Sequence, residues 1–167
     1  MFAFKQVEGD KRTRYQTMQQ QLSALLEEET FWLSNLSNTA SHLFHSLTDI
    51  NWAGFYLMKD GELVLGPFMG KTACVRIPVG KGVCGTAVKE KQPQLVKNVF
   101  DFPGHIACDA ASRSEIVIPL IVNGNIIGVL DIDSPSEARF DEEDLAGLEK
   151  YVEILIKKTD WSRLSQN

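Results

Sequence analysis

The sequence predicts an α+β fold in which an antiparallel sheet of about six strands packs against helices. Three observations support this prediction: helical periodicity at both ends of the chain, strand-like apolar runs between them, and turn signals that join neighbouring runs into hairpins. The chain has 167 residues, 44% hydrophobic and 23% charged, as is typical of one folded domain. We expect a single domain over residues 1–167, with a helical extension at 1–29 and a core at 30–160.

Helices are expected near both ends. Residues 12–26 and 30–47 have helical patterns, and in the second segment apolar residues recur at spacings of three and four. Thr30 is the expected N-cap of that helix. A last helix is expected from its cap, Asp141, to about Lys158, because acidic residues fill its first turn and lysines its last.

Two hairpins are expected between the helices. The runs WAGFYLM at 52–58 and ELVLGPFM at 62–69 flank a Lys-Asp-Gly turn. The runs EIVIPLIV at 115–122 and NIIGVLDID at 125–133 flank an Asn-Gly turn, which is the strongest hairpin signal in the chain.

Shorter elements fill the middle of the chain. Strands are expected near 74–77 and 94–97, and a short helix is expected near 83–89, after a glycine-rich stretch. Residues 98–114 show no clean periodicity, so we expect a long loop there. Loops of this length inside compact domains are often functional.

Composition and charge argue against several functions. The formal net charge is −5 and the basic residues are scattered, whereas nucleic-acid binders need a clustered positive surface. No run approaches the roughly 20 apolar residues that cross a bilayer, and the first residues lack a signal-peptide pattern. We therefore expect a cytoplasmic protein, without membrane or nucleic-acid partners.

Three acidic residues are candidates for a ligand site. Asp131 and Asp133 share one face of their strand, because side chains alternate along a strand. Pairing around the Asn-Gly turn places Glu115 opposite roughly Ile132, within a residue or two of both aspartates. Such a cluster suits an ammonium group or a shared proton. A solvated strand end is the alternative interpretation.

Two aromatic residues are candidates for the wall of the same site. Trp52 and Tyr56 fall on one strand face, with Gly54 between them leaving room for a ligand. Aromatic side chains with a polar tip commonly line small-ligand pockets. Ordinary core packing remains the alternative.

Cysteine chemistry is the other functional signal. Cys74, Cys84 and Cys108 would lie in a reducing compartment, where structural disulfides are rare. Cys108 sits in a polar segment of the long loop, where an apolar packing residue has little to fill. Cys84 lies at the start of the expected short helix, where the helix dipole would favour a thiolate or hold an anion.

A metal site and hydrolase chemistry compete with this interpretation. His105, Cys108, Cys74 and Cys84 could be zinc ligands, but the chain has no CxxC pair and the cysteine spacings match no common zinc module. We therefore expect no metal. No nucleophile-elbow or papain-like context surrounds the histidines, and those in the second helix are expected to be structural or exposed.

Four segments closely resemble the free methionine-(R)-sulfoxide reductases, which are single-domain proteins of the GAF fold. They are NWAGFYL, LGPFMGKTACVRIPVGKGVCGTA, GHIACDAASRSEIVIPL and IIGVLDIDSP. The resemblance runs from about Thr30 to Trp161. It implies that the N- and C-terminal helices pack on one face of the sheet and that loops and a helix line a ligand pocket on the other.

The resemblance also implies residue roles. Cys108 would be the catalytic cysteine and Cys74 its resolving partner, with Cys84 near the site in a less settled role. Substrate-binding residues would be Trp52, Tyr56, Glu115, Asp131 and Asp133.

The implied reaction is reduction of free methionine (R)-sulfoxide. A Cys108 sulfenic acid and a Cys74–Cys108 disulfide would form in turn, with thioredoxin as external reductant and no bound cofactor. A GAF sensor that binds a small molecule or nucleotide without catalysis is the main alternative. A structural module that dimerises is another, and GAF domains often form homodimers through their terminal helices.

Overall fold

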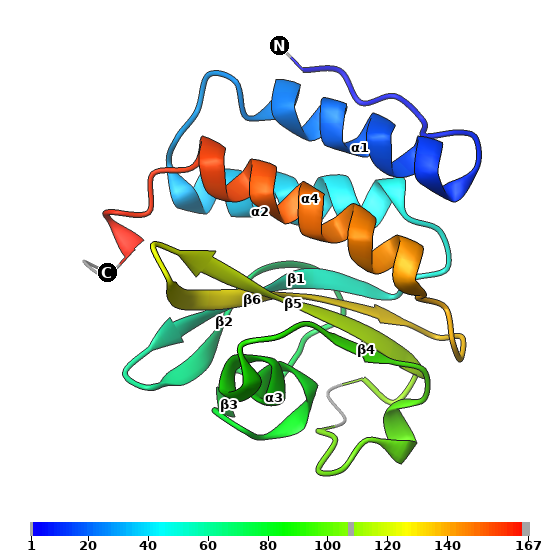
Figure 1. Ribbon diagram of the computed structural model, residues 1–167, viewed down its shortest axis with the longest axis vertical. Helices are drawn as coiled ribbons and strands as arrows, with labels where there is room; N and C mark the ends of the chain where they lie inside the picture. The colour runs from blue at the N-terminus through cyan, green and yellow to red at the C-terminus, as the bar shows by residue number, and fades with distance from the viewer. Residues whose placement is uncertain (1, 107–108, 165–167) are drawn as a thin grey trace.

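The computed structural model describes residues 2–106 and 109–164, and its centre is a six-stranded antiparallel sheet of order β3-β2-β1-β6-β5-β4 (Figure 1). The strands are β1 (Trp52–Lys59), β2 (Glu62–Gly70), β3 (Arg76–Pro78), β4 (Gln94–Val96), β5 (Ser114–Val122) and β6 (Asn125–Ser134). The helices are α1 (Lys11–Leu25), α2 (Trp32–Ser46), α3 (Gly82–Glu90), α4 (Glu142–Lys158) and the short 3-10 helix η1 (Val99–Asp101). The α+β class and both hairpins are confirmed.

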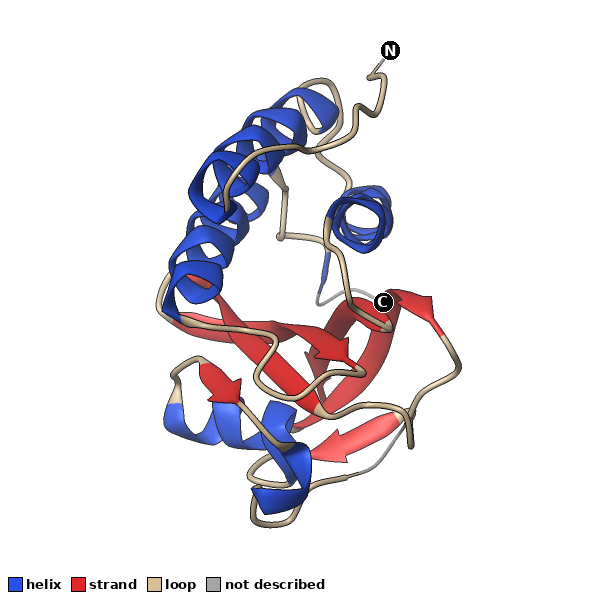
Figure 2. Ribbon diagram, turned by 90° about the vertical axis from the view of Figure 1, so that its right-hand side faces the viewer, coloured by secondary structure: helices blue, strands red, loops and turns tan. Residues whose placement is uncertain are grey.

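The helices form layers above and below the sheet (Figures 1 and 2). Helices α2 and α4 contact one face, as expected of the terminal helices, and α3 contacts the other. Helix α1 differs from expectation, because it packs mainly on α4 and forms an outer layer. The Tyr15 ring fills the space that a side chain at Gly147 would occupy, and its hydroxyl donates a hydrogen bond to Asp144 Oδ1 over 2.8 Å. These contacts attach α1 to α4 rather than to the sheet.

Helix ends and short strands show two further differences. Thr30 is not the N-cap of α2: Phe31 takes that position without a side-chain cap, and the Glu29 carboxylate accepts hydrogen bonds from the backbone N–H of both residues. Asp141 is confirmed as the cap of α4, in a capping box with Asp144. The short third strand begins two residues later than expected, at Arg76.

Two apolar cores lie on opposite faces of the sheet. The larger core joins α2 and α4 to alternate residues of β5 and β6, and it includes Phe55, Leu130 and Ile132. The smaller core lies under α3 and includes Trp52 and Tyr56. The buried acidic residues Glu115 and Asp131 lie on the side of this second core, so the functional site is expected there. No helix among the described residues is long and apolar enough to cross a membrane.

Candidate active site

A small recess opens in the second core, between the sheet, α3 and the segments around 72–73 and 105–112. Its volume is about 40 Å³. Its described lining residues are Trp52, Tyr56, Thr72, Ala73, Ile77, Gly82, Val83, Cys84, His105, Ile106, Asp109, Ser112, Glu115, Asp131 and Asp133. All five substrate-binding residues expected from the sequence therefore line one cavity.

Strand register gathers the acidic residues. Glu115 on β5 pairs with Asp133 on β6, one residue from the expected partner, and Asp133 also pairs with Trp52 on β1. Asp131 shares the face of Asp133, while Leu130 and Ile132 point into the larger core. Glu115 and Asp131 are buried, and Asp133 is partly exposed. The described lining includes no lysine or arginine, so Glu115, Asp131 and Asp133 have no basic partner among the described lining residues.

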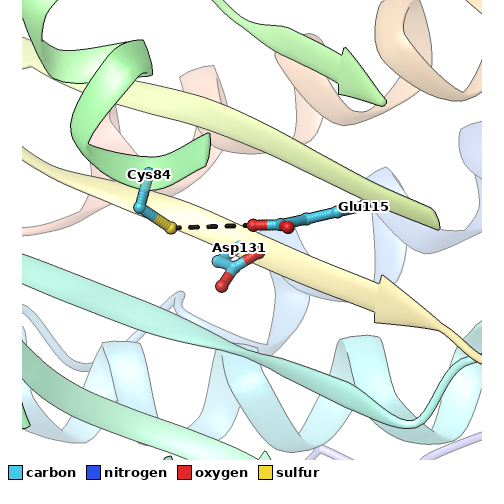
Figure 3. Close-up of side chains that lie close together, drawn as sticks. All are labelled: Cys84, Glu115 and Asp131. Atoms are coloured by element: carbon cyan, nitrogen blue, oxygen red, sulfur yellow. Dashed lines mark hydrogen bonds between the residues drawn. The ribbon is translucent and has the colours of Figure 1, made fainter. Parts of the chain in front are cut away.

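Cys84 reaches the same acids from the first turns of α3. Its Sγ donates to Glu115 Oε1 over 4.0 Å, and Asp131 lies beside this pair (Figure 3). The three ligand-type atoms lie within 4.8 Å of one another. Cys84 is buried and is a free thiol. Helix α3 therefore places the Cys84 sulfur, a soft nucleophilic atom, beside the carboxyl groups.

Burial and mutual repulsion shift the pKa values of the cluster. Desolvation, with the charges of Asp131 and Asp133, raises the pKa of Glu115 well above its usual range. Desolvation raises the pKa of Asp131 to about 6, although hydrogen bonds from Glu115 and Cys84 lower it. Desolvation and the charge of Asp131 also raise the pKa of Asp133 well above normal. At neutral pH the cluster thus retains protons, with Asp131 its most readily ionised member.

The expected thiolate at Cys84 is corrected by this environment. Desolvation raises the pKa of the Cys84 thiol well above its usual range, and the charge of Asp131 adds to the effect. The helix dipole is worth only about 1 kcal/mol at an N-terminus. Burial beside carboxylates outweighs it, so Cys84 stays a neutral S–H donor.

Trp52 and Tyr56 form one wall of the recess and bind the segment that follows β2 by hydrogen bonds. Their rings stack with centroids 6.0 Å apart. Trp52 Nε1 donates to the carbonyl of Lys71, and the Tyr56 hydroxyl donates to the carbonyl of Cys74. The expectation that Gly54 leaves room for a ligand is wrong: a Cβ there would lie 2.3 Å from Phe68 Cβ and 2.7 Å from Trp52 Cη2. The absence of a side chain at Gly54 instead allows the Phe68 ring to stack on the Trp52 ring.

Sequence reasoning did not select three polar residues near this recess. Asn51 donates to Asp109 Oδ2 and to Ser112 Oγ, 3.1 Å each, and thereby fixes the loop against β1. A backbone hydrogen bond from Ala111 lowers the pKa of Asp109. Asp109 and Ser112 stand inside the motif GHIACDAASRSE, so the motif was the available signal, but aperiodic loops give no facing direction.

Several buried polar atoms at or beside the recess lack a hydrogen-bond partner. They are Asn51 Oδ1, His105 Nδ1 and Asp131 Oδ1. An unsatisfied buried polar atom costs roughly 1–3 kcal/mol, so such atoms at a cavity indicate a polar ligand. The orphaned Asp131 oxygen points to a hydrogen-bond donor or a cation.

Of the two remaining cysteines, the structure describes only Cys74. Cys74 is in a disulfide bond, and its carbonyl is the acceptor of the Tyr56 hydroxyl. Cys108 lies outside the described residues, as does Ala107.

Comparison with known proteins assigns the chain to a family. A family model described as the GAF domain matches residues 34–154. The chain is 54% identical over 157 residues to the free methionine-R-sulfoxide reductase of Escherichia coli (strain K12), which covers 92% of this chain and 95% of that protein. The chain belongs to the free methionine-R-sulfoxide reductase family.

Two further relatives support this assignment. The free methionine-R-sulfoxide reductase of Saccharomyces cerevisiae is 47% identical over 141 residues, or 80% of this chain and 78% of that one. The X-ray structure of the Neisseria meningitidis free methionine-R-sulfoxide reductase, in complex with its substrate, matches with a TM-score of 0.93 and 43% identity. That match covers 98% of this chain and 99% of the other. The resemblance expected from the sequence is confirmed.

Proposed function

We propose that this protein reduces free methionine-R-sulfoxide to methionine, as its relatives' names describe. The observation that carries the proposal is the recess of Glu115, Asp131 and Asp133, which the described residues supply with no basic partner. The α-ammonium group of a free amino acid provides the missing positive charge. A peptide-bound residue does not, and it would leave the acids unmatched.

The lining suggests how the rest of the substrate is held. Trp52 and Tyr56 pack against its side chain, since both rings face the recess. The substrate carboxylate meets backbone N–H groups in the first turn of α3, near Gly82–Gly85. The N–H of Gly85 already donates to the Lys81 carbonyl, so the donors are those before it.

We assign the proton-holding role to Glu115. The pKa of Glu115 is raised well above normal by burial and by its acidic neighbours. A protonated acid can donate to the sulfoxide oxygen, which makes the sulfur open to attack. Asp131, whose pKa is about 6, is then the carboxylate that pairs with the ammonium group.

The redox steps use the two remaining cysteines. The Cys108 thiolate attacks the sulfoxide sulfur, oxygen passes to Cys108 as a sulfenic acid, and methionine leaves. The Cys74 thiol then attacks the sulfenic sulfur, which releases water and forms a disulfide. The disulfide-bonded state of Cys74 and the free state of Cys84 support this division of roles. Thioredoxin, in a cytoplasmic setting, restores both thiols.

A coupled assay tests this function. NADPH consumption through thioredoxin reductase and thioredoxin is followed with the R and S epimers of methionine sulfoxide, each free and N-acetylated. We expect turnover of the free R epimer alone and none with the Cys108→Ser variant. Equal turnover of the N-acetylated R epimer would contradict the role of the acids, and unchanged turnover by Cys108→Ser would contradict the assignment of that cysteine.

A further inference from the structure

We propose that the recess is also a site for a soft divalent cation of the zinc class, held by Cys84 Sγ and by the carboxylates of Glu115 and Asp131. The bound ion excludes the amino-acid substrate. The binding part of this inference needs only the geometry, whereas the exclusion part rests on the proposed function.

The ligand atoms are close to a zinc arrangement. Cys84 Sγ and Glu115 Oε1 are 4.0 Å apart, and with Asp131 all three ligand atoms lie within 4.8 Å. Zinc bonds of about 2.3 Å to sulfur and 2.0–2.2 Å to oxygen give a tetrahedral S···O edge of roughly 3.5 Å. Side-chain rotations that move each atom by a few tenths of an ångström bring Cys84 Sγ and Glu115 Oε1 to that spacing. A water or the nearby Asp133 completes four ligands.

An independent observation points to a ligand at this position. Asp131 is only 6% exposed, and its Oδ1 has no hydrogen-bond partner. A cation bound beside Cys84 and Glu115 would satisfy that oxygen (Figure 3). The described lining has no lysine or arginine that already fills this role.

The space and the proton balance also fit an ion. A volume of about 40 Å³ holds on the order of three waters, which is enough for a cation with one or two waters. Binding releases the Cys84 thiol proton and the Glu115 carboxyl proton to solvent, and no electron is transferred.

This site differs from the zinc set that the sequence brings to mind. That set consisted of His105, Cys108, Cys74 and Cys84, and the proposed reaction consumes Cys74 and Cys108 as a disulfide. Cys84 is free while Cys74 is disulfide-bonded, so the cation site survives oxidation of the other cysteines.

Cobalt provides a direct probe. Co²⁺ is added anaerobically to the Cys74→Ser/Cys108→Ser double variant, in which Cys84 is the only thiol. We expect one equivalent to bind with a thiolate-to-cobalt charge-transfer band in the near ultraviolet, and Zn²⁺ to abolish the band. Adding Cys84→Ser should remove the band, and adding Asp131→Asn or Glu115→Gln should weaken binding about tenfold or more. Asp101→Asn, an exposed substitution in η1, is the matched control and should change nothing.

Two results overturn the site: no band in the double variant, or a band that persists without Cys84. Circular dichroism of each variant confirms that it is folded. Free methionine-R-sulfoxide, which the double variant cannot reduce, should raise the apparent Kd for Co²⁺, and an unchanged Kd overturns the exclusion claim. Failure of the wild type in the coupled assay, with the cobalt band intact, contradicts the proposed function and leaves the cation site standing.

Discussion

The carboxyl cluster is built at a cost to stability, and Asp131 is its centre. Asp131 touches both Glu115 and Cys84, and each of these pKa values is raised in part by its charge. The charge of Asp131 therefore suits it to bind a cation but lowers the stability of the folded protein. A ligand cation would relieve this repulsion between the acidic groups.

We expect Asp131→Asn to stabilise the unliganded protein at alkaline pH. The folded pKa of about 6 lies above the usual value of 3.8, so the native state binds more protons than the unfolded state in this interval. The unfolding free energy contributed by this group therefore falls as pH rises from about 4 through 6. Urea unfolding should show the variant to be more stable than wild type by about 1–3 kcal/mol at pH 8 and nearly equal at pH 4.

The matched control for this experiment is Asp60→Asn. Asp60 is exposed in the β1–β2 turn with a positive φ that asparagine also adopts. Its substitution should leave stability unchanged at both pH values. A loss of stability in Asp131→Asn at pH 8 would show that the aspartate is compensated in the unliganded protein.

Sequence reasoning reached this cluster and its shared proton, but not the protonation state of Cys84. Period-two alternation and the Asn-Gly turn placed Glu115 within one residue of its observed partner, Asp133. The turn-based register could be off by one because β5 and β6 contain a bulge between Leu120 and Ile121. The neutral Cys84 thiol was missed, because burial arises from tertiary packing that a helix-start argument does not include.

At the scale of elements, close packing on β1 fixes the aromatic wall. Gly54 faces Phe68 on β2, and a Cβ would lie 2.3 Å from Phe68 Cβ and 2.8 Å from its Cα. The Phe68 Cα belongs to the backbone, so it cannot move out of the way as the end of a flexible side chain can.

We expect Gly54→Ala to damage both stability and substrate binding. The extra methyl group forces Phe68 and Trp52 apart, which should cost about 2–3 kcal/mol of unfolding free energy. Displacement of Trp52 should also raise the KM for free methionine-R-sulfoxide severalfold. Urea unfolding and steady-state kinetics measure the two effects, and a stable variant with normal KM would contradict this account of the wall.

Gly147→Ala provides the contrast, because it lies on the opposite side of the sheet. A Cβ there would lie 2.3 Å from the Tyr15 ring, so α1 must shift away from α4. We expect a loss of about 1–2 kcal/mol, after allowing for a helix-propensity gain of about 1 kcal/mol. KM should not change. Glu149→Ala, an exposed α4 substitution, is the control for both measurements.

Long, strongly periodic elements were predictable and the outer layer was not. The boundaries of α1 and α2 lie within two residues of expectation at each end. Nothing in the pattern of α1 said that its apolar residues would meet α4 rather than the sheet. Thr30 is not the cap because α2 begins at Trp32, which makes Phe31 the N-cap residue, and the Glu29 carboxylate accepts from the N–H groups of Thr30 and Phe31.

At the scale of the molecule, His42 ties the helical layers together. Its Nδ1 lies 2.7 Å from the Tyr151 hydroxyl and its Nε2 lies 2.8 Å from Gln21 Oε1, so it joins α1, α2 and α4. This confirms the expectation of a structural or exposed histidine. Burial lowers the pKa of His42 to about 4.

We expect this histidine to make the layers sensitive to acid. A folded pKa of about 4, below the usual 6.5, means that its contribution is complete above pH 6.5 and is lost as pH falls through 4. The stability difference between wild type and His42→Gln should shrink by up to about 3 kcal/mol between pH 7.5 and 4. A difference that stays constant with pH would contradict a buried neutral imidazole.

A homodimer through the terminal helices stays a prediction of the sequence.

The central claim is that one protein molecule carries out one reduction with two of its three thiols. Fully reduced protein is mixed with excess free methionine-R-sulfoxide without reductant, and methionine and remaining thiols are both counted. We predict one methionine formed and two thiols lost per chain, with Cys84 the thiol that remains. Methionine formed without loss of thiols, or thiols lost without methionine, would contradict the account.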